Sequence, residues 1–178
     1  MAPAALVART PRTRRVTGVE DPEATIAELR VGYFRKHGFP SDGGSSARWV
    51  RYPLWGGHVV LPNVTARKLA LPLHDLHHLV TGYDTSWTGE AEIAAWELAA
   101  GCHGYVAAWV LNVAAFTIGV VIAPRRTWRA FVRGRGSATL YRYHWDDRYL
   151  AMRLADLREL LGVTEDSAAE HGTGNRRR

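Results

Sequence analysis

The sequence predicts a mostly α-helical fold, a compact domain with one long apolar helix and a short β-hairpin near residues 48–61. Three observations support this. Several stretches carry apolar residues at helical spacing, and glycines stand where those stretches would end. Of the 178 residues 47% are hydrophobic and 22% charged, a composition typical of globular proteins. The one cysteine, Cys102, excludes an intrachain disulfide and a cysteine-rich zinc module.

We expect a single metal-binding domain over residues 20–165, between disordered tails at 1–19 and 166–178. The first tail is basic and acid-free, but its apolar run is too short for a secretory signal. It also shares features with an organelle transit peptide, although two prolines interrupt any amphipathic helix. The net charge is +6, yet only two of the 23 basic residues are lysines. Such an arginine bias is typical of a GC-rich genome, so we predict no nucleic-acid partner. The single cysteine fits a reducing compartment, so we expect a cytoplasmic, peripherally membrane-associated protein.

The first helix is expected to begin at Asp21-Pro22-Glu23 and to end near His37, before a capping Gly38. Residues 40–46 have the composition of a loop. Residues 48–61 are rich in aromatic and β-branched residues on both sides of Gly56-Gly57, which could form a two-residue turn. Pro53 limits this segment to an edge strand or an extended loop.

A second helix is predicted from Thr65 to Gly82, with Pro72 breaking it and leaving residues 74–81 as the important part. After the turn GYDTS, residues 87–104 suggest another helix. Ile93, Trp96 and Ala100 should face inward.

Residues 105–123 contain no charged side chain, and their length approaches the roughly 20 residues that span a bilayer. They could form a central buried helix, a helix lying partly in a membrane, or a true span. The arginines that follow, from Arg125 onward, suit either lipid phosphates or a solvated helix face. A last helix is expected from Asp146 or Asp147 to Gly162, with Leu150, Leu154, Leu157 and Leu161 in the core.

The most informative residues are a candidate metal site. His74 and His78 are four apart, so on a helix their imidazoles project from one face and can bind one ion. Asp75 lies beside that face, and Glu90 begins the next helix, so both could add oxygen ligands. Two nitrogen and two oxygen ligands suit zinc, with iron or manganese as alternatives. Glu90 and Glu97, seven apart, are the candidate catalytic carboxylates, with Glu97 acting as a base or an orienting group.

A rival interpretation uses His74, His77 and His78 as one histidine box of a membrane diiron enzyme that modifies lipids. Such enzymes carry several boxes, whereas the other histidines here stand alone. In the first interpretation His77 is either a partner of the ligands or a surface residue.

The pattern His74-Asp75-x-x-His78, eleven further residues and then Glu90 resembles the signature of the coenzyme Q biosynthesis protein four family. The surrounding HDLHHLVTGYDTSWTGEAEIAAWELAAG is similar to that family's metal helix, glycine-containing turn and Gly-Glu helix start. ADLRELLGV resembles its closing helix, so the likeness covers roughly residues 21–163. The chain departs from the family in its shortness and in the His77-His78 pair.

The resemblance implies a helical, peripherally membrane-associated protein of ubiquinone or related prenylquinone biosynthesis. It would hold zinc through His74, Asp75, His78 and Glu90 and bind a prenyl lipid or quinone intermediate in a groove. One implied role is C1 decarboxylation of the prenylated ring precursor, either as a lyase or by an oxidative reaction. The alternative is a non-catalytic lipid-binding scaffold that organises other quinone-biosynthesis proteins. A homodimer is compatible with this. Zinc cannot supply an oxidative step, so such a step needs a redox-active metal, or oxygen and another protein.

Overall fold

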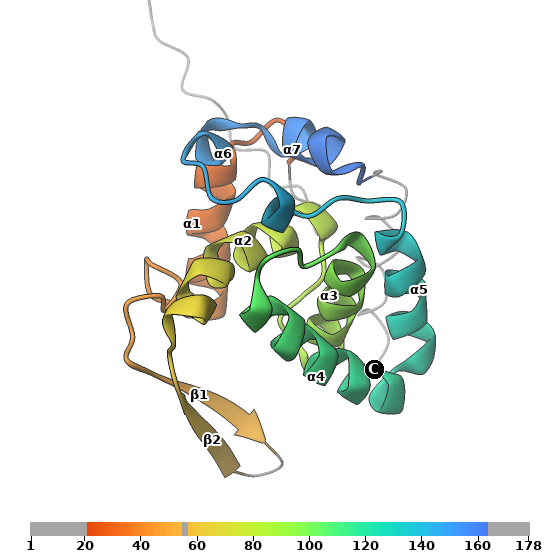
Figure 1. The fold of residues 1–178 in the computed structure, drawn as a ribbon. Coiled ribbons are helices and arrows are strands. Elements are labelled where there is room, and N and C mark those ends of the chain that lie inside the picture. The colour runs from red at the N-terminus through yellow and green to blue at the C-terminus, as the bar shows by residue number, and fades with distance from the viewer. Residues whose placement is uncertain (1–20, 55–56, 164–178) are drawn as a thin grey trace, which may run out of the picture.

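The structure of the protein, a computed structural model, describes residues 21–54 and 57–163 (Figure 1). The predicted tails, 1–19 and 166–178, lie outside the described residues. The fold is mostly helical, as predicted, with one pair of short strands in the described ranges. The elements are α1 (Ile26–His37), β1 (Trp49–Leu54), β2 (Gly57–Pro62), α2 (Thr65–Thr81), α3 (Trp87–Ala100), α4 (Val106–Ile122), α5 (Pro124–Gly134), the 3-10 turn η1 (Leu140–Arg142), α6 (Arg148–Ala151) and α7 (Leu154–Leu161).

Helix α3 lies at the centre and packs along α4 and α5, while α2 packs against α1 on one side and α7 on another (Figure 1). Ile93 and Trp96 of α3 are fully buried, as predicted, whereas Ala100 is only half-buried. A Cβ added at Gly134 of α5 would stand 2.4 Å from the backbone carbonyl oxygen of Trp96. The missing side chain therefore allows α5 to approach α3 closely.

Helix α1 begins later than the sequence suggested. Thr25 is its N-cap and forms a capping box with Glu28: each side chain bonds the other residue's backbone N–H. Asp21 instead closes a tight turn by accepting the N–H of Glu23 at 3.0 Å. The Asp-Pro-Glu start was wrong because a better capping pair follows it. The predicted end, at His37 with Gly38 as cap, is confirmed.

The two strands pair antiparallel, with Leu54 opposite Gly57. The hairpin near residues 48–61 is thus confirmed, but Gly57 belongs to β2 and not to the turn. The linking positions, 55 and 56, lie outside the described residues. Pro53 sits within β1, which its missing N–H allows because each strand of a two-stranded sheet has a free edge.

Helix α2 is continuous from Thr65 to Thr81, so the predicted break at Pro72 is wrong. The proline removes one intrahelical hydrogen bond. After the proline, the core side of α2 carries Leu73, Leu76 and Val80, and all three side chains are fully buried. Their burial offsets the lost bond, since each contributes about 2 kcal/mol.

Helix α4 is not the central buried helix that was one of the three interpretations of residues 105–123. Only Ala108, Asn112 and Gly119 of this helix are buried. Its outer face exposes large apolar side chains: Val106, Trp109, Val110, Leu111, Val113, Val120, Val121 and Ile122. Among the described residues, no helix has the length and apolar character needed to cross a membrane.

The last predicted helix is divided into α6 and α7 by extended residues at Met152 and Arg153. The break lets this segment pair with the start of α1. Ile26 donates its N–H to Met152 at 2.9 Å, and Leu154 donates to Ala24 at 3.0 Å. Backbone groups that a continuous helix would have paired internally are therefore satisfied across the fold. The predicted leucines at 154, 157 and 161 are fully buried, and Leu150 is half-buried.

Candidate metal site

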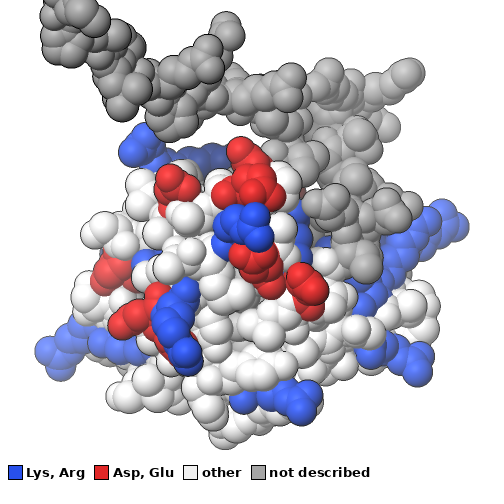
Figure 2. All heavy atoms as spheres, turned by 90° about the horizontal axis from the view of Figure 1, so that it is seen from above, with Lys and Arg blue, Asp and Glu red and all other residues white. Residues whose placement is uncertain are grey.

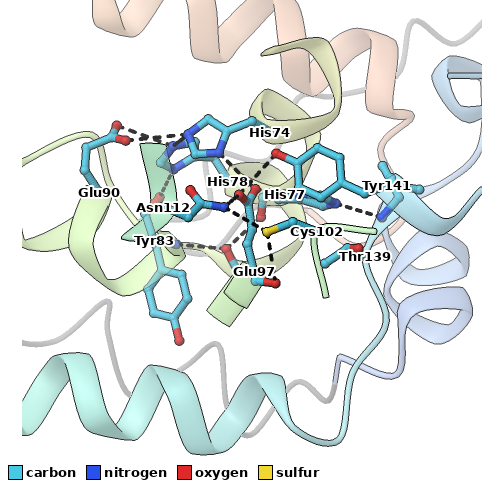
Figure 3. Close-up of polar contacts among 12 residues, drawn as sticks. His74, His77, His78, Tyr83, Glu90, Glu97, Cys102, Asn112, Thr139 and Tyr141 are labelled. Carbon is cyan, nitrogen blue, oxygen red and sulfur yellow. Dashed lines mark hydrogen bonds and ion pairs between the residues drawn. The ribbon is translucent and has the colours of Figure 1, made fainter. Parts of the chain in front are cut away.

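Three predicted ligands meet between α2 and α3 (Figure 3). His74 and His78 lie one turn apart on α2, and their Nε2 atoms are 3.2 Å from each other. The carboxylate of Glu90, in the first turn of α3, lies 3.5 Å from His74 Nε2 and 3.4 Å from His78 Nε2. Two ligand atoms about 2.0–2.1 Å from one zinc ion, at a tetrahedral angle, are about 3.3 Å apart. The three observed separations fit that geometry.

The far side of each imidazole is held in place. His74 Nδ1 lies 2.9 Å from the carboxylate of Glu97, and His78 Nδ1 lies 2.9 Å from the backbone carbonyl of Tyr83. Both partners only accept hydrogen bonds, so each Nδ1 carries the proton. Both Nε2 atoms then face Glu90, the orientation that metal-binding histidines need. Without a metal, His74 Nε2 also carries a proton, because the nearby carboxylates raise the pKa of this imidazole.

The turn between α2 and α3 brings Glu90 back toward the histidines. Ser86 caps α3 by accepting the N–H of Gly89 at 3.1 Å, and Asp84 accepts the N–H of Ser86 at 2.9 Å. A Cβ on Gly89 would lie 2.1 Å from the backbone oxygen of Asp84. Only glycine fits there, so the glycine that precedes Glu90 has a steric cause.

Glu97 is the centre of a buried polar network. Its Oε1 accepts from His74 Nδ1 and, at 2.6 Å, from His77 Nδ1. Its Oε2 accepts from Asn112 Nδ2 at 2.5 Å and from the Tyr141 hydroxyl at 3.1 Å. The predicted role as an orienting group agrees with this geometry, while direct contact of Glu97 with a metal does not, because its oxygens are occupied by these four donors.

Sequence reasoning missed Asn112 and Tyr141. Asn112 is the one amide side chain in an otherwise apolar helix, and its polar side chain is a signal that could have found it. Tyr141 lies 44 positions from Glu97, in a turn without periodicity, and no local pattern marks it.

His77 points away from the other two histidines into this network. Its Nε2 accepts the backbone N–H of Leu140 at 2.9 Å, and its Nδ1 donates to Glu97. Both ring nitrogens are therefore engaged. His77 is fully buried, so it is not a surface residue, and it acts as a partner of the ligand network.

Asp75 stands apart from the three converging ligands. It is 6% exposed, and its Oδ2 has no hydrogen-bond partner in the described structure. Burial raises the pKa of Asp75 to about 6, against the opposing charges of His74, His78 and Arg30. A buried oxygen without a partner beside two imidazoles suits a cation, but Asp75 as the fourth ligand stays a prediction.

The charges of the site support one another. Burial alone would lower the pKa of His74, but the carboxylates of Glu97 and Glu90 outweigh it and raise that pKa well above 6.5. Burial likewise opposes ionisation of Glu90 and Glu97. Their histidine partners prevail and hold the pKa of both carboxyls well below the ordinary 4.5. Both carboxyls are therefore ionised, and the negative charge of Glu90 favours binding of a cation.

One side of the site is open and another is aromatic. The side chains of Glu90 and His74 are 40% and 21% exposed, whereas that of His78 is 2% exposed. Tyr33 of α1 stacks on the His78 ring with centroids 5.8 Å apart, and His37 packs on Tyr33. No local pattern marks this aromatic contact, because Tyr33 lies 45 positions before His78 and on another helix.

Glu92, the remaining carboxylate of α3, lies on another face of the helix and ties it to a neighbouring helix. It is fully buried and forms a bidentate pair with Arg126, at 2.9 and 2.6 Å, that ties α3 to α5. One of the arginines expected to face lipid is thus paired with a buried carboxylate, although its own side chain is 49% exposed.

Comparisons with family models, with curated proteins and with solved structures gave no match. The likeness to the coenzyme Q protein four family therefore rests on the motif and on its surroundings, and membership stays a prediction.

Proposed function

We propose that this protein binds a divalent metal ion, zinc, through His74, His78 and Glu90, with Asp75 as the fourth ligand. The observation that carries the proposal is the convergence of two Nε2 atoms and one carboxylate at ligand separations, with both Nδ1 protons held from behind. Iron or manganese would be accepted by the same donors. Because His77 already uses both ring nitrogens, this arrangement does not favour a histidine-box diiron site.

The site has the character of a reactive rather than a structural one. Structural zinc sites are closed by four protein ligands, whereas catalytic sites keep a position for water or substrate. With four ligands from this chain, that position would be a fifth one, to which a zinc site can expand. Here Glu90 is the most exposed donor, so small molecules can reach the ion from its side. A bound divalent ion supplies Lewis acidity, which polarises carboxylate or phenolate oxygens.

By resemblance, the proposed substrate is a prenylated aromatic acid of ubiquinone or related prenylquinone biosynthesis, and the proposed reaction removes its C1 carboxyl group. In this chain Glu97 would keep His74 in position, and Tyr33 would offer an aromatic wall to the ring of the substrate. The alternative is a non-catalytic lipid-binding scaffold for other quinone-biosynthesis enzymes. The exposed apolar face of α4 favours it, since that face needs no chemistry to bind a lipid.

Elemental analysis tests the metal. The purified protein should carry about one ion per chain, and the double variant His74→Ala/His78→Ala should carry none, because two of its ligands are removed. The control is His58→Ala, which removes an exposed imidazole on β2. Equal metal content in the double variant and the control would refute the assignment.

Complementation separates the two functional classes. In a strain that lacks a coenzyme Q protein four homologue, Glu90→Gln keeps the shape of the side chain but removes its charge. Loss of quinone synthesis with this variant, at normal protein levels, would support catalysis. Full rescue by Glu90→Gln would favour the scaffold, and failure of the wild type would remove the quinone assignment alone.

We also propose peripheral membrane association through α4 and α5. Residues 98–145 contain six arginines and no acidic residue. The face over α6 and α7 is mixed instead: Figure 2 shows acidic and basic side chains side by side there. Two ion pairs of this region are Arg148–Asp146 and Arg153–Asp156. An exposed apolar helix beside arginines suits an anionic lipid surface, where each arginine contributes about 1 kcal/mol.

Vesicle sedimentation tests this association. Wild type should sediment with anionic vesicles at low salt and be partly released at 1 M salt, where the Debye length is about 3 Å. Val121→Glu places a charge on the α4 face, where Val121 is 79% exposed, and should abolish binding. Val31→Glu, at an exposed position of α1, is the matched control and should still bind. Equal binding by both variants would exclude α4 as the contact.

A further inference from the structure

Asn112 is a buried polar residue in the middle of the apolar helix α4. It is 4% exposed, and its neighbours on the outer face, Leu111 and Val113, are exposed to solvent. Its amide nitrogen lies 2.5 Å from Oε2 of Glu97 and 3.4 Å from the Cys102 sulfur. The amide therefore joins α4 to the carboxylate that holds His74 (Figure 3).

The orientation of that carboxylate depends on few groups. Oε1 is shared by His74 and His77, and Oε2 by Asn112 and Tyr141. Glu97 is fully buried, so no solvent replaces a lost donor freely. Without the amide, Oε2 keeps a single donor, and the carboxylate can rotate about its last bond and move Oε1 away from His74.

We propose that Asn112 is a positioning residue for the metal site. Acting through Glu97, it sets the orientation of His74 and couples the site to the position of α4 on the rest of the fold. This inference rests on the proposed metal function. Groups behind a histidine ligand change metal affinity by 10- to 100-fold when they are removed. Asn112 acts one residue further away than Glu97, so about tenfold is expected.

The test uses the full-length protein with cobalt(II) and zinc as probes. Asn112→Leu removes the amide at similar volume, and Tyr141→Phe removes the other donor to Oε2 while keeping the ring. Thr139→Val is the matched control. It removes a fully buried hydroxyl that donates to the Gly101 carbonyl at 2.5 Å and is not among the four donors to Glu97.

For Asn112→Leu we expect zinc affinity to fall about tenfold and the visible cobalt(II) spectrum to change, while Thr139→Val matches wild type in both. Tyr141→Phe should also lower zinc affinity and change the cobalt(II) spectrum. It keeps the test decisive if Asn112→Leu does not fold. Wild-type affinity and spectrum in both variants would overturn the inference while leaving the metal site intact. A wild type that binds neither ion would instead overturn the proposed function, and this inference with it.

Discussion

Replacing Asp75 by asparagine should have opposite effects on the stability of the metal-free protein and on its affinity for metal. The carboxylate is buried, and its Oδ2 has no partner in the described structure. Burial raises its pKa from 3.8 to about 6. A carboxyl whose pKa is higher in the folded than in the unfolded state lowers the free energy of unfolding as the pH rises above its unfolded-state pKa. At about 1.4 kcal/mol for each pKa unit, the loss above pH 6 is about 3 kcal/mol.

The sign of the pH dependence follows from this shift. Well below pH 3.8 the carboxyl is protonated in both folded and unfolded chains, and Asp75→Asn should match wild type. As the pH rises from about 4 to about 6, only the unfolded chain releases the proton freely, so the variant becomes the more stable protein, by up to about 3 kcal/mol at pH 7.5. If Asp75 is a ligand, zinc affinity should fall in the same variant.

Urea unfolding in the presence of a chelator measures the first effect, and competition with a chromophoric chelator measures the second. Asp21→Asn is the control, because Asp21 is exposed and an asparagine can still accept the Glu23 N–H. Asp75→Asn that is no more stable than wild type at pH 7.5 would refute the reasoning about a buried carboxylate without a partner. Unchanged zinc affinity would remove Asp75 from the ligand set.

Three other predictions concern the turn, the thiol and the ligands. Gly89→Ala should destabilise the protein by about 2 kcal/mol or more in urea unfolding, since its Cβ would overlap the Asp84 carbonyl, whereas Gly32→Ala, where a Cβ meets nothing within 4 Å, should stabilise it by about 1 kcal/mol. Equal effects would contradict the steric argument. Cys102 is fully buried and its pKa is raised to about 12, so a thiol reagent should label it only in denaturant; rapid native labelling would contradict its burial. Zinc should be released as the pH falls, because protons compete for His74, whose pKa is raised; a chelator assay showing constant binding from pH 8 to 5 would exclude histidine ligands.

The extent of the helices could be predicted where local chemistry decides it. Glycine caps and apolar spacing located the ends near His37, Thr81 and Leu161 correctly. The failures have tertiary causes. The break at Met152 exists because the backbone there pairs with the start of α1, and α2 continues through Pro72 because the core holds it. In both cases the deciding contacts come from distant parts of the chain, which the spacing of apolar residues within one segment does not reveal.

The same division applies to the site. One helical turn between His74 and His78, and one short connection to Glu90, make these three residues meet for local reasons, so spacing could predict them. Glu97 follows Glu90 at helical spacing and was found in the same way. The groups that complete the network come from α4, η1 and α1, and their positions depend on how those elements pack. The spacing of residues within one helix cannot predict such packing.

The pairing of residues 24–26 with residues 152–154 has a consequence for the order of folding. Arg153 and Glu23, joined across this junction, are 130 positions apart in the chain. Closing so long a loop is slow relative to local helix pairing. Helices α2 and α3 adjoin in sequence, so His74, His78 and Glu90 should assemble early, before α1 is anchored and Tyr33 settles against His78. During synthesis on the ribosome, the proposed metal site should therefore be complete and open before α1 covers that side.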